Sequence, residues 1–270
     1  MIKIATLGPE NSYSHILSQK ISEDNNKIIL CKTLNEVFEK VDNDKNIEGV
    51  VPIENLIHGS VRECLLGLLK YGVYITESYD FNIYHCLAAK GDKFNSIVSH
   101  PQALAQCSDF LKNFREQNLI ETTSTSEAMN LAKKDSSLAA IGSIDSAKNE
   151  ELKILYKNIG NNKHNITRFI RIKKNFENND IKNEKTSLII LPKEDRPGLL
   201  FEILSIFKIK DINLTKIESI PTGEKIGEYL FYLEIEGSCN QLNLKQSFDF
   251  LSTLVDVKIL GSYNVKKIDQ

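Results

Sequence analysis

The sequence predicts an α/β domain of two lobes followed by a smaller α+β domain. Residues 1 to about 172 alternate between strand-like apolar runs and amphipathic helices, which is typical of parallel sheets covered by helices. Residues 173–185 are polar and charged with no periodic apolar face, so they predict a linker. Beyond them the order becomes strand-helix-strand-strand-helix-strand, the ferredoxin-like arrangement. At 270 residues the chain is long enough for two domains.

The strands and helices of the first domain follow from the hydrophobic period and the turn residues. Apolar runs bounded by turns predict strands at 2–7, 28–31, 48–53, 73–81, 84–89, 96–98, 138–141 and 165–172. Apolar residues at helical spacing predict helices at 12–22, 34–41, 59–71, 102–111 and 126–133. This pattern suits two lobes with a cleft between them. We expect the domain at 1–176, with one lobe at roughly 1–76 and 157–176 and the other at 77–156.

The second domain is expected at residues 186–270. Its patterns predict strands at 187–191, 213–218, 228–236 and 257–263, with helices at 198–207 and 242–251. This order occurs in small regulatory modules and also in many unrelated proteins, so the fold alone does not assign a function.

Composition places the chain among ordinary globular proteins. Apolar residues make up 41% and charged residues 26%, and 34 Lys and Arg against 36 Asp and Glu leave a net charge of -2. This balance provides no basic field for nucleic acid or an anionic membrane, and no stretch is long enough to span a bilayer. The N-terminus lacks the pattern of a signal peptide, and the five cysteines are scattered. We therefore expect a cytoplasmic protein with reduced, mostly buried thiols and a small-molecule partner.

The run from Asn165 to Phe169 places a hydroxyl, a permanent cation and an aromatic ring in three consecutive positions of one strand. Strand alternation predicts Thr167 and Phe169 on one face and Arg168 on the other. Thr167 and Arg168 reach one ligand only if the strand ends or bends there. Taken alone, such a run is also typical of a surface ladder on a sheet.

Three other segments place polar side chains where strands give way to helices. Residues 8–14 form a turn entering a helix, whose exposed N–H groups favour an anion, although a plain capped helix fits equally. Residues 52–61 place Glu54 and Asn55 at the end of a strand, where ligands gather in α/β sheets or where polar residues only close a turn. Residues 99–107 repeat this arrangement at another strand-to-helix junction.

No metal or nucleophile pattern stands out. The five histidines show neither mutual i,i+4 pairing nor ligand-like spacing with cysteines, and His100 is expected to cap a helix or fill a core more often than to act as a base. Neither a phosphate-loop spacing nor a Gly-x-Ser-x-Gly elbow is present. We expect chemistry without a metal or a cofactor.

Together, these segments resemble the motifs of the prephenate dehydratase family in order and spacing. The matched motifs are Gly-Pro-x-Gly-Ser/Thr-Tyr/Phe-Ser at 8–14, Pro-Ile-Glu-Asn-Ser/Thr at 52–56, Ser-His-Pro-Gln at 99–102 and Asn-x-Thr-Arg-Phe at 165–169. Residues 196–204 and 212–221 resemble the two phenylalanine-binding motifs of an ACT regulatory domain. The resemblance implies a two-lobed catalytic domain like that of periplasmic binding proteins, with the site between the lobes, and a C-terminal ferredoxin-like ACT domain.

The family converts prephenate to phenylpyruvate, water and carbon dioxide, driven by aromatisation of the ring. The resemblance implies that Thr167 donates a proton to the departing hydroxyl, Arg168 grips a carboxylate and Phe169 walls the ring. It also implies the further substrate-binding side chains Asn55, Ser12, Tyr13, Ser14, Ser99, Gln106 and Ser124. Closure of the lobes would then exclude water.

Four positions depart from the family pattern. Asn11 stands in place of Gly, although Asn tolerates left-handed backbone angles well. Leu56 replaces a Ser or Thr, which removes a hydroxyl worth about 0.5–1.5 kcal/mol if it contacts substrate. In the regulatory module, Ile220 replaces Arg and Leu199 replaces Ala, so Leu199 is expected to narrow an amino-acid pocket.

The resemblance also implies inhibition by phenylalanine, bound between the subunits of a homodimer or of a homotetramer built from dimers. The implied effector-binding residues are Pro197, Gly198, Leu199, Leu200, Asn213, Leu214, Glu218 and Ser219. Two alternatives stay open: an arogenate dehydratase with the same site, and a non-catalytic amino-acid sensor, which would not need a positioned acid. Deletion from about Lys185 onward is expected to abolish inhibition and leave turnover.

Overall fold

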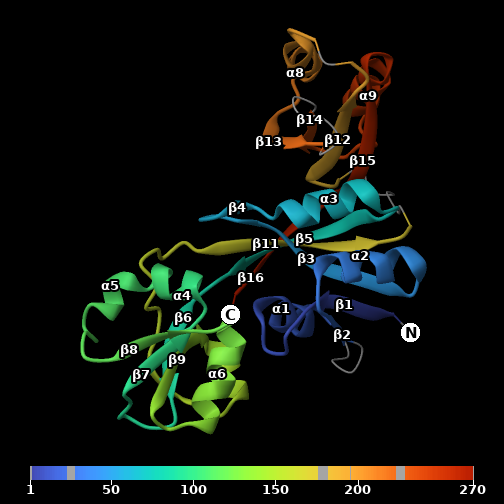
Figure 1. Cartoon of the computed structure of the whole chain (residues 1–270). Coiled ribbons are helices and arrows are strands. Elements are labelled where there is room, and N and C mark those ends of the chain that lie inside the picture. Colours follow the sequence, from blue (N-terminus) through green and yellow to red (C-terminus); the bar gives the residue numbers. More distant parts are fainter. Residues whose placement is uncertain (1, 23–27, 176–181, 195, 223–228, 270) are drawn as a thin grey trace.

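The computed structural model contains three β-sheets, two in an N-terminal part of two lobes and one in a C-terminal module (Figure 1). It describes residues 2–22, 28–175, 182–194, 196–222 and 229–269. In Figure 1 the second lobe lies at the lower left, the first lobe lies in the centre and at the right, and the C-terminal module stands above the first lobe.

The first lobe is built on a mixed sheet with the strand order β16-β5-β11-β3-β1-β2, and a short strand β4 lies beside β3. Its strands are β1 (Lys3–Leu7), β2 (Ile28–Cys31), β3 (Ile47–Asn55), β4 (Gly59–Ser60), β5 (Tyr74–Asn82), β11 (Ile166–Lys173) and β16 (Val265–Ile268). β1 pairs in parallel with β2 and β3, whereas β11 runs antiparallel between β3 and β5. The expected parallel pairing therefore lies on one side of β3 and an antiparallel strand lies on the other.

The helices of the first lobe are α1 (Tyr13–Ile21), α2 (Leu34–Asn43) and α3 (Arg62–Lys70). Two of the three helices, α1 and α2, start at side-chain caps, and α3 packs closely against α2. α2 begins at the cap Thr33, whose Oγ1 accepts from the Glu36 N–H at 3.1 Å, while Glu36 Oε2 accepts from the N–H of Lys32, the residue before the cap, at 2.9 Å. Gly67 lets α3 lie against α2, since a Cβ atom there would be 2.5 Å from the Phe38 ring.

The second lobe is built on a sheet with the order β10-β6-β9-β7-β8. Its elements are β6 (His85–Ala89), β7 (Ser96–Ser99), α4 (Pro101–Gln106), α5 (Ser108–Leu111), β8 (Asn118–Glu121), α6 (Thr125–Lys134), β9 (Leu138–Ser143), α7 (Ile144–Asn149) and β10 (Lys153–Tyr156). His100 caps α4, as expected, because its Nδ1 accepts from the Gln102 N–H at 3.2 Å. The sequence did not predict β8, whose residues are all exposed and so carry no alternating apolar pattern. It also missed the short elements α7 and β10.

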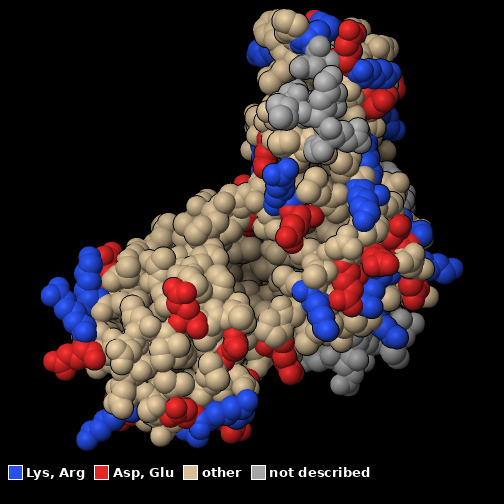
Figure 2. All heavy atoms as spheres, viewed as in Figure 1, with Lys and Arg blue, Asp and Glu red and all other residues tan. Residues whose placement is uncertain are grey.

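The chain crosses between the lobes twice, once between β5 and β6 and once between β10 and β11. β5 lies wholly in the first sheet, so the first crossing comes after Asn82 and not at the expected boundary of 76/77. The strand pattern of residues 73–81 predicted a strand, but only its pairing with β11 assigns it to a lobe. Figure 2 shows the surface hollowed between the two lobes.

The C-terminal module has the predicted element order and an antiparallel sheet, β13-β14-β12-β15. Its elements are β12 (Lys185–Pro192), α8 (Leu199–Ile209), β13 (Leu214–Pro221), β14 (Tyr229–Glu236), α9 (Leu242–Leu254) and β15 (Val255–Tyr263). α8 and α9 cover one face of the sheet and bury a separate apolar core with it. Residues 176–181 of the predicted linker, and residue 228 at the predicted start of a strand, lie outside the described residues.

The other face of this sheet packs on the first lobe. Ile220, Leu230 and Leu260 share one buried cluster with Leu65 and Leu68 of α3. After β15 the chain returns to the first lobe, where β16 pairs in parallel with β5. Residues 265–268 therefore complete the first sheet, although the sequence assigned them to the second domain; pairing with the edge strand β5 satisfies their backbone groups.

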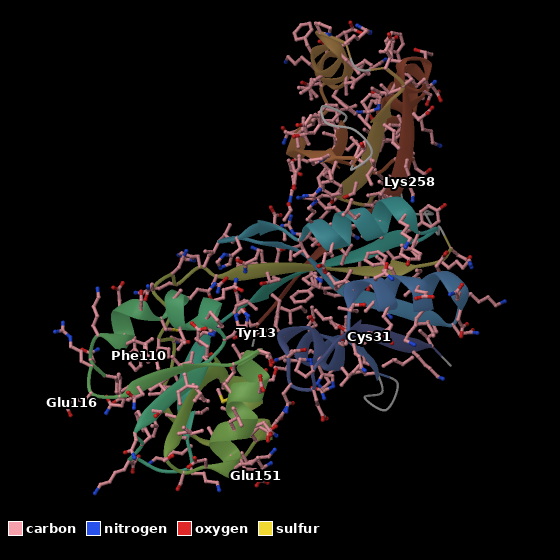
Figure 3. All side chains as sticks on the ribbon, viewed as in Figure 1. Tyr13, Cys31, Phe110, Glu116, Glu151 and Lys258 are labelled. Carbon is pink, nitrogen blue, oxygen red and sulfur yellow. The ribbon has the colours of Figure 1, made fainter. Side chains whose placement is uncertain are left out.

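Lys258 of β15 joins the module to the end of α3. Its Nζ donates to the carbonyl oxygens of Leu68, Leu69 and Tyr71 at 2.8, 2.9 and 2.9 Å. These carbonyls close the last turn of the helix, where a positive charge is favourable. Burial lowers the pKa of Lys258. In Figure 3 the residue lies beside α3, between the module and the first lobe.

All five cysteines are buried and none of them is in a disulfide. Burial raises the pKa of Cys31 to about 11 and those of Cys86 and Cys107 to about 12. Of the helices in the described residues, none combines the length and the apolar character needed to cross a bilayer.

We expect Lys258→Met to lower the free energy of unfolding by about 1–3 kcal/mol, because the carbonyl oxygens at the end of α3 lose a charged donor. Urea unfolding followed by circular dichroism measures the change. Lys153→Met is the matched control, since Lys153 forms an exposed ion pair with Asp92 at 2.7 Å and such pairs contribute about 0–1 kcal/mol. Equal losses for the two variants would contradict the role of Lys258.

Candidate active site

A continuous set of side-chain hydrogen bonds joins the two lobes. Tyr13 of α1 contacts His85 of β6, with 3.1 Å between Oη and Nδ1, and in Figure 3 Tyr13 lies where the lobes meet. His85 Nε2 lies 2.8 Å from Gln106 Oε1 on α4. Asn165, just before β11, donates from Nδ2 to the same Gln106 oxygen at 3.2 Å. The network therefore runs from the first lobe into the second and back.

The network ends at Asn55 and Thr167, which lie directly opposite each other in the β3–β11 register and so share a face of the sheet. Asn55 Nδ2 donates to Thr167 Oγ1 at 2.9 Å and to Asn165 Oδ1 at 3.0 Å. Asn55 Oδ1 accepts from the backbone N–H groups of Ile57 and His58 at 3.0 and 3.1 Å, which fixes the orientation of the amide. Because Thr167 Oγ1 accepts from Asn55, its hydroxyl hydrogen stays available for a ligand.

The hydrogen-bond pattern fixes the tautomer of His85. Gln106 Oε1 is an acceptor only, so His85 Nε2 carries the hydrogen and Nδ1 accepts from the Tyr13 hydroxyl. Burial lowers the pKa of His85, whose side chain is only 4% exposed. The imidazole is therefore neutral near pH 7, and protonation would cost it the acceptor that holds Tyr13.

A pocket of about 770 Å³ borders this network. It is lined by Ile57, His58, Ile83, Tyr84, His85, Gln102, Ala105, Gln106, Asn158, Gly160, Asn161, Asn162, Lys163 and Asn165. Lys163 is its cationic side chain, and no Asp or Glu is among these described lining residues. Asn55 and Thr167 do not line the pocket; they lie one hydrogen bond behind Asn165.

Asn11 links the turn before α1 to α7 of the second lobe. Its φ of 63° is left-handed, so Asn does keep the turn where the family pattern has Gly. Its Nδ2 donates to Glu150 Oε1 at 3.0 Å, and its Oδ1 accepts from Asn149 at 2.8 Å. Lys20 and Asp145 add an ion pair of 3.3 Å between the lobes. These contacts of Asn11 and Lys20 therefore join α1 and the turn before it to the second lobe.

The structure brings Thr167, Asn55, Gln106 and Tyr13 of the predicted residues into the network, but several others serve the fold. Ser12 caps α1, where its Oγ accepts from the His15 N–H, and Ser124 caps α6 in the same way. Ser99 is fully buried and donates to the Ile141 carbonyl at 2.7 Å, while the Ser14 side chain is only 7% exposed.

Two residues of the Thr-Arg-Phe run do not line the pocket either. Phe169 is 2% exposed and packs edge-on against Phe81 in the core of the first lobe. Arg168 points to the opposite face from Thr167, as strand alternation predicted. There it pairs with Asp80, with 2.7 Å from Nε to Oδ1, and with Glu234 of the C-terminal module at 3.5 Å.

Sequence patterns did not identify His85 or His58 as functional residues, and they identified Asn165 only as the first residue of the run. His58 accepts from Gln106 Nε2 at 2.9 Å and so extends the network to the loop after β3. His58 follows the end of β3, and His85 and Asn165 lie where strands begin after the chain crosses between the lobes. The sequence could predict these strand ends, but only the fold brings the three residues to Gln106. In the described part of the chain, no group of His, Cys, Asp and Glu could hold a metal ion.

The implied effector residues fall into two groups in the C-terminal module. Gly198, Leu199 and Leu200 line a hollow of about 170 Å³, with Pro197 in the same turn. Asn213, Leu214, Glu218 and Ser219 lie outside that lining, on or beside the edge strand β13.

The departures from the family pattern have different surroundings. Leu199 is 5% exposed, packs in the core of the module and also lines the hollow. Ile220, in place of Arg, is buried against the first lobe. Leu56 is 62% exposed, so its side chain fills no part of the core.

Comparison with known proteins decides the family. The family model described as prephenate dehydratase matches residues 4–177, and the ACT domain model matches residues 190–238. This chain belongs to the prephenate dehydratase family. A curated prephenate dehydratase of Methanocaldococcus jannaschii is 38% identical over 265 residues, covering 95% of this chain and 96% of the relative.

Solved structures of this family have the same fold over nearly the whole chain. The prephenate dehydratase of Staphylococcus aureus subsp. aureus Mu50 has a TM-score of 0.87 at 26% identity and covers 97% of this chain and all of its own. The Arthrobacter aurescens prephenate dehydratase, in complex with L-Phe, has a TM-score of 0.87 at 27% identity, covering 97% of this chain and 90% of that one. The two-lobed catalytic domain and the C-terminal ACT domain are therefore confirmed.

The neutral state of His85 predicts a pH dependence of stability. Below about pH 6.5, the unfolded chain binds a proton that folded His85 resists, so the free energy of unfolding falls as the pH decreases. We expect the wild type to lose more stability between about pH 7 and pH 5 than His85→Gln, measured by urea unfolding at each pH. His164→Gln, at an exposed site, is the control and should keep the wild-type slope. Identical slopes for all three proteins would refute a buried neutral His85.

Proposed function

We propose that this chain is a prephenate dehydratase whose proton donor is Thr167, held at the end of the interlobe network. The observation that carries the proposal is the Asn55 amide, which donates to Thr167 Oγ1 at 2.9 Å while two backbone N–H groups fix its orientation. A hydroxyl that accepts such a bond is a better donor in its turn. The family match gives the substrate, and this geometry supports the role of Thr167.

The reaction needs a proton and a shaped site. The bond to the ring carboxylate breaks and releases CO₂, and its electron pair forms the aromatic ring as the C–OH bond breaks. The departing oxygen takes the Thr167 proton and leaves as water, and solvent restores the hydroxyl. A threonine is a weak acid, so its position must supply most of the effect. We propose that no cofactor takes part, since aromatisation drives the step.

The pocket supports prephenate over arogenate as the substrate. Arogenate carries an ammonium group where prephenate has a keto oxygen, and a buried ammonium needs an acidic partner. No Asp or Glu is among the described residues that line the pocket, whereas Lys163 and several amide side chains suit carboxylate and keto oxygens. The available Thr167 hydrogen also argues against a sensor that only binds.

We expect Thr167→Val to lower kcat by roughly 10²–10⁴, because it removes the proton donor and keeps the side-chain shape. Phenylpyruvate formation from prephenate measures the effect. Thr76→Val is the matched control: Thr76 lies on β5, where its Oγ1 donates to the Arg171 carbonyl at 3.3 Å, away from the network. A folded Thr167→Val enzyme with most of its turnover would rule out this assignment.

We further propose that phenylalanine inhibits the enzyme from the ACT domain, since a relative of known structure binds L-Phe. The two groups of implied effector residues do not share one hollow within a chain, which supports a site completed by a second copy. The edge strand β13 is available to pair with another chain, and Phe201, Ile209 and Ile217 are exposed on the same module. We propose a homodimer or a tetramer of dimers.

We propose a cytoplasmic location, which is supported by five cysteines that form no disulfide.

Phenylalanine at 100 times its dissociation constant should stabilise the native enzyme by about 2.7 kcal/mol, because it binds only the folded state. A rise in the unfolding temperature measures this, with D-phenylalanine as the control for specific recognition. The same addition should suppress phenylpyruvate formation. An unchanged unfolding temperature, together with unchanged turnover, would contradict an effector site in this module.

A further inference from the structure

Strands β3 and β11 carry two opposite charges, Glu54 and Arg168, on the face that points away from the hydrogen-bond network. In the β3–β11 register Asn55 lies opposite Thr167, and the next pair along is Glu54 opposite Arg168. Successive side chains of a strand point to opposite faces. Asn55 and Thr167 therefore share one face with the network, while Glu54 and Arg168 stand directly behind them on the other face.

The ACT domain presents two complementary charges at this place. Lys216 on β13 and Glu234 on β14 are register partners, so they too stand side by side on one face of their sheet. Lys216 Nζ lies 2.8 Å from Glu54 Oε1, and Glu234 Oε2 lies 3.5 Å from Arg168 Nη1. Glu54, Arg168, Lys216 and Glu234 thus form a charge quartet, in which each acid faces a base from the other domain.

The quartet is held firmly on the ACT side. The side chains of Lys216 and Glu234 are 13% and 2% exposed, so solvent screens their charges little. Glu234 also accepts from the Tyr232 hydroxyl at 2.9 Å and lies 3.4 Å from Lys185. Lys216 lies 3.8 Å from Glu218 on its own strand, and across the interface it donates to Ser60 Oγ of β4 at 2.6 Å.

The catalytic side of the quartet is less constrained by its own domain. Arg168 is additionally held by Asp80, its register partner on β5. Glu54 has no ion pair within the first lobe among the described residues, so Lys216 is its salt-bridge partner. A base that belongs to the ACT domain therefore fixes the strand end that carries Asn55.

We propose that Lys216 and Glu234 of the ACT domain are positioning residues of the active site, acting through Glu54 and Arg168. This inference rests on the proposed dehydratase activity. By fixing the reverse face of β3 and β11, the two ion pairs hold Asn55 and Thr167 at hydrogen-bond distance. A displacement of about 1 Å at such a pair lowers a rate by about 10²-fold. The ACT domain therefore belongs to the catalytic machinery as well as to its control.

This role changes the expected result of truncation. Deletion from about Lys185 onward would remove Lys216 and Glu234, and it would also take β16 away from β5 of the first sheet. We now expect the truncated chain to lose turnover along with inhibition. Point variants in the full-length chain are thus the sharper experiment.

A charge-swap cycle in the full-length enzyme tests the quartet. We expect Lys216→Glu and Glu54→Lys each to lower kcat at least tenfold with little change in KM, because the donor is displaced while the pocket that binds substrate is kept. The double variant should recover most of the wild-type kcat, since it restores the ion pair with reversed polarity. Glu234→Gln should lower kcat in the same way, with the unfolding temperature showing that the protein is folded.

Lys193→Met is the control, because Lys193 forms an exposed pair with Asp256 on the same domain and should keep wild-type kcat. Single variants with wild-type kcat, or a double variant no faster than the product of the single effects, would overturn the proposal. If Lys216→Glu does not fold, Lys216→Met and Lys216→Arg decide it: the first should lower kcat and the second should keep it. Wild-type protein without dehydratase activity would instead refute the proposed function, before any variant is compared.

Discussion

The antiparallel register between β3 and β11 is the constraint on which the site depends. It places Asn55 opposite Thr167 and Glu54 opposite Arg168, and strand alternation then sends the two pairs to opposite faces. One face meets the interlobe network and the other meets the ACT domain. A shift of β11 by one residue would break both pairs, place Thr167 opposite Glu54 and turn its side chain to the charged face. The register therefore fixes the positions of both the proposed proton donor and the charged pair that meets the ACT domain.

In the hydrogen-bond network between the lobes, each polar group has a defined role as a donor or an acceptor. Two backbone N–H groups orient the Asn55 amide, and a neutral His85 donates to Gln106 while it accepts from Tyr13. Such groups are costly to bury unless each finds a partner, so the set is stable only when the lobes are together. The network lies where the chain passes from β5 of the first lobe to His85 of β6 in the second.

The C-terminal part of the chain packs closely on the first lobe and completes its sheet. Its sheet shares a buried cluster with α3, Lys258 closes the end of that helix, and β16 completes the first sheet. Removing it would expose apolar surface and unpair a strand edge in the catalytic domain. The charge quartet lies within this same interface, and its Lys216 belongs to the edge strand β13.

The sequence by itself determined the element order of the C-terminal module and most of the order of the first domain, because these follow from the local hydrophobic period, although it missed β8, α7 and β10. The site residues Asn55, Gln106 and Thr167 came from short motifs that resemble those of the family. The sequence also predicted that Thr167 and Arg168 face apart. Only the tertiary structure decided what each face meets: His85 and Gln106 on one side, Lys216 and Glu234 on the other. It likewise turned Ser99 and Phe169 into parts of the core and returned residues 265–268 to the first sheet. These outcomes depend on pairing between segments that are distant in the sequence. Local patterns do not specify which strand pairs with which, or which residues pack on a given face of a sheet.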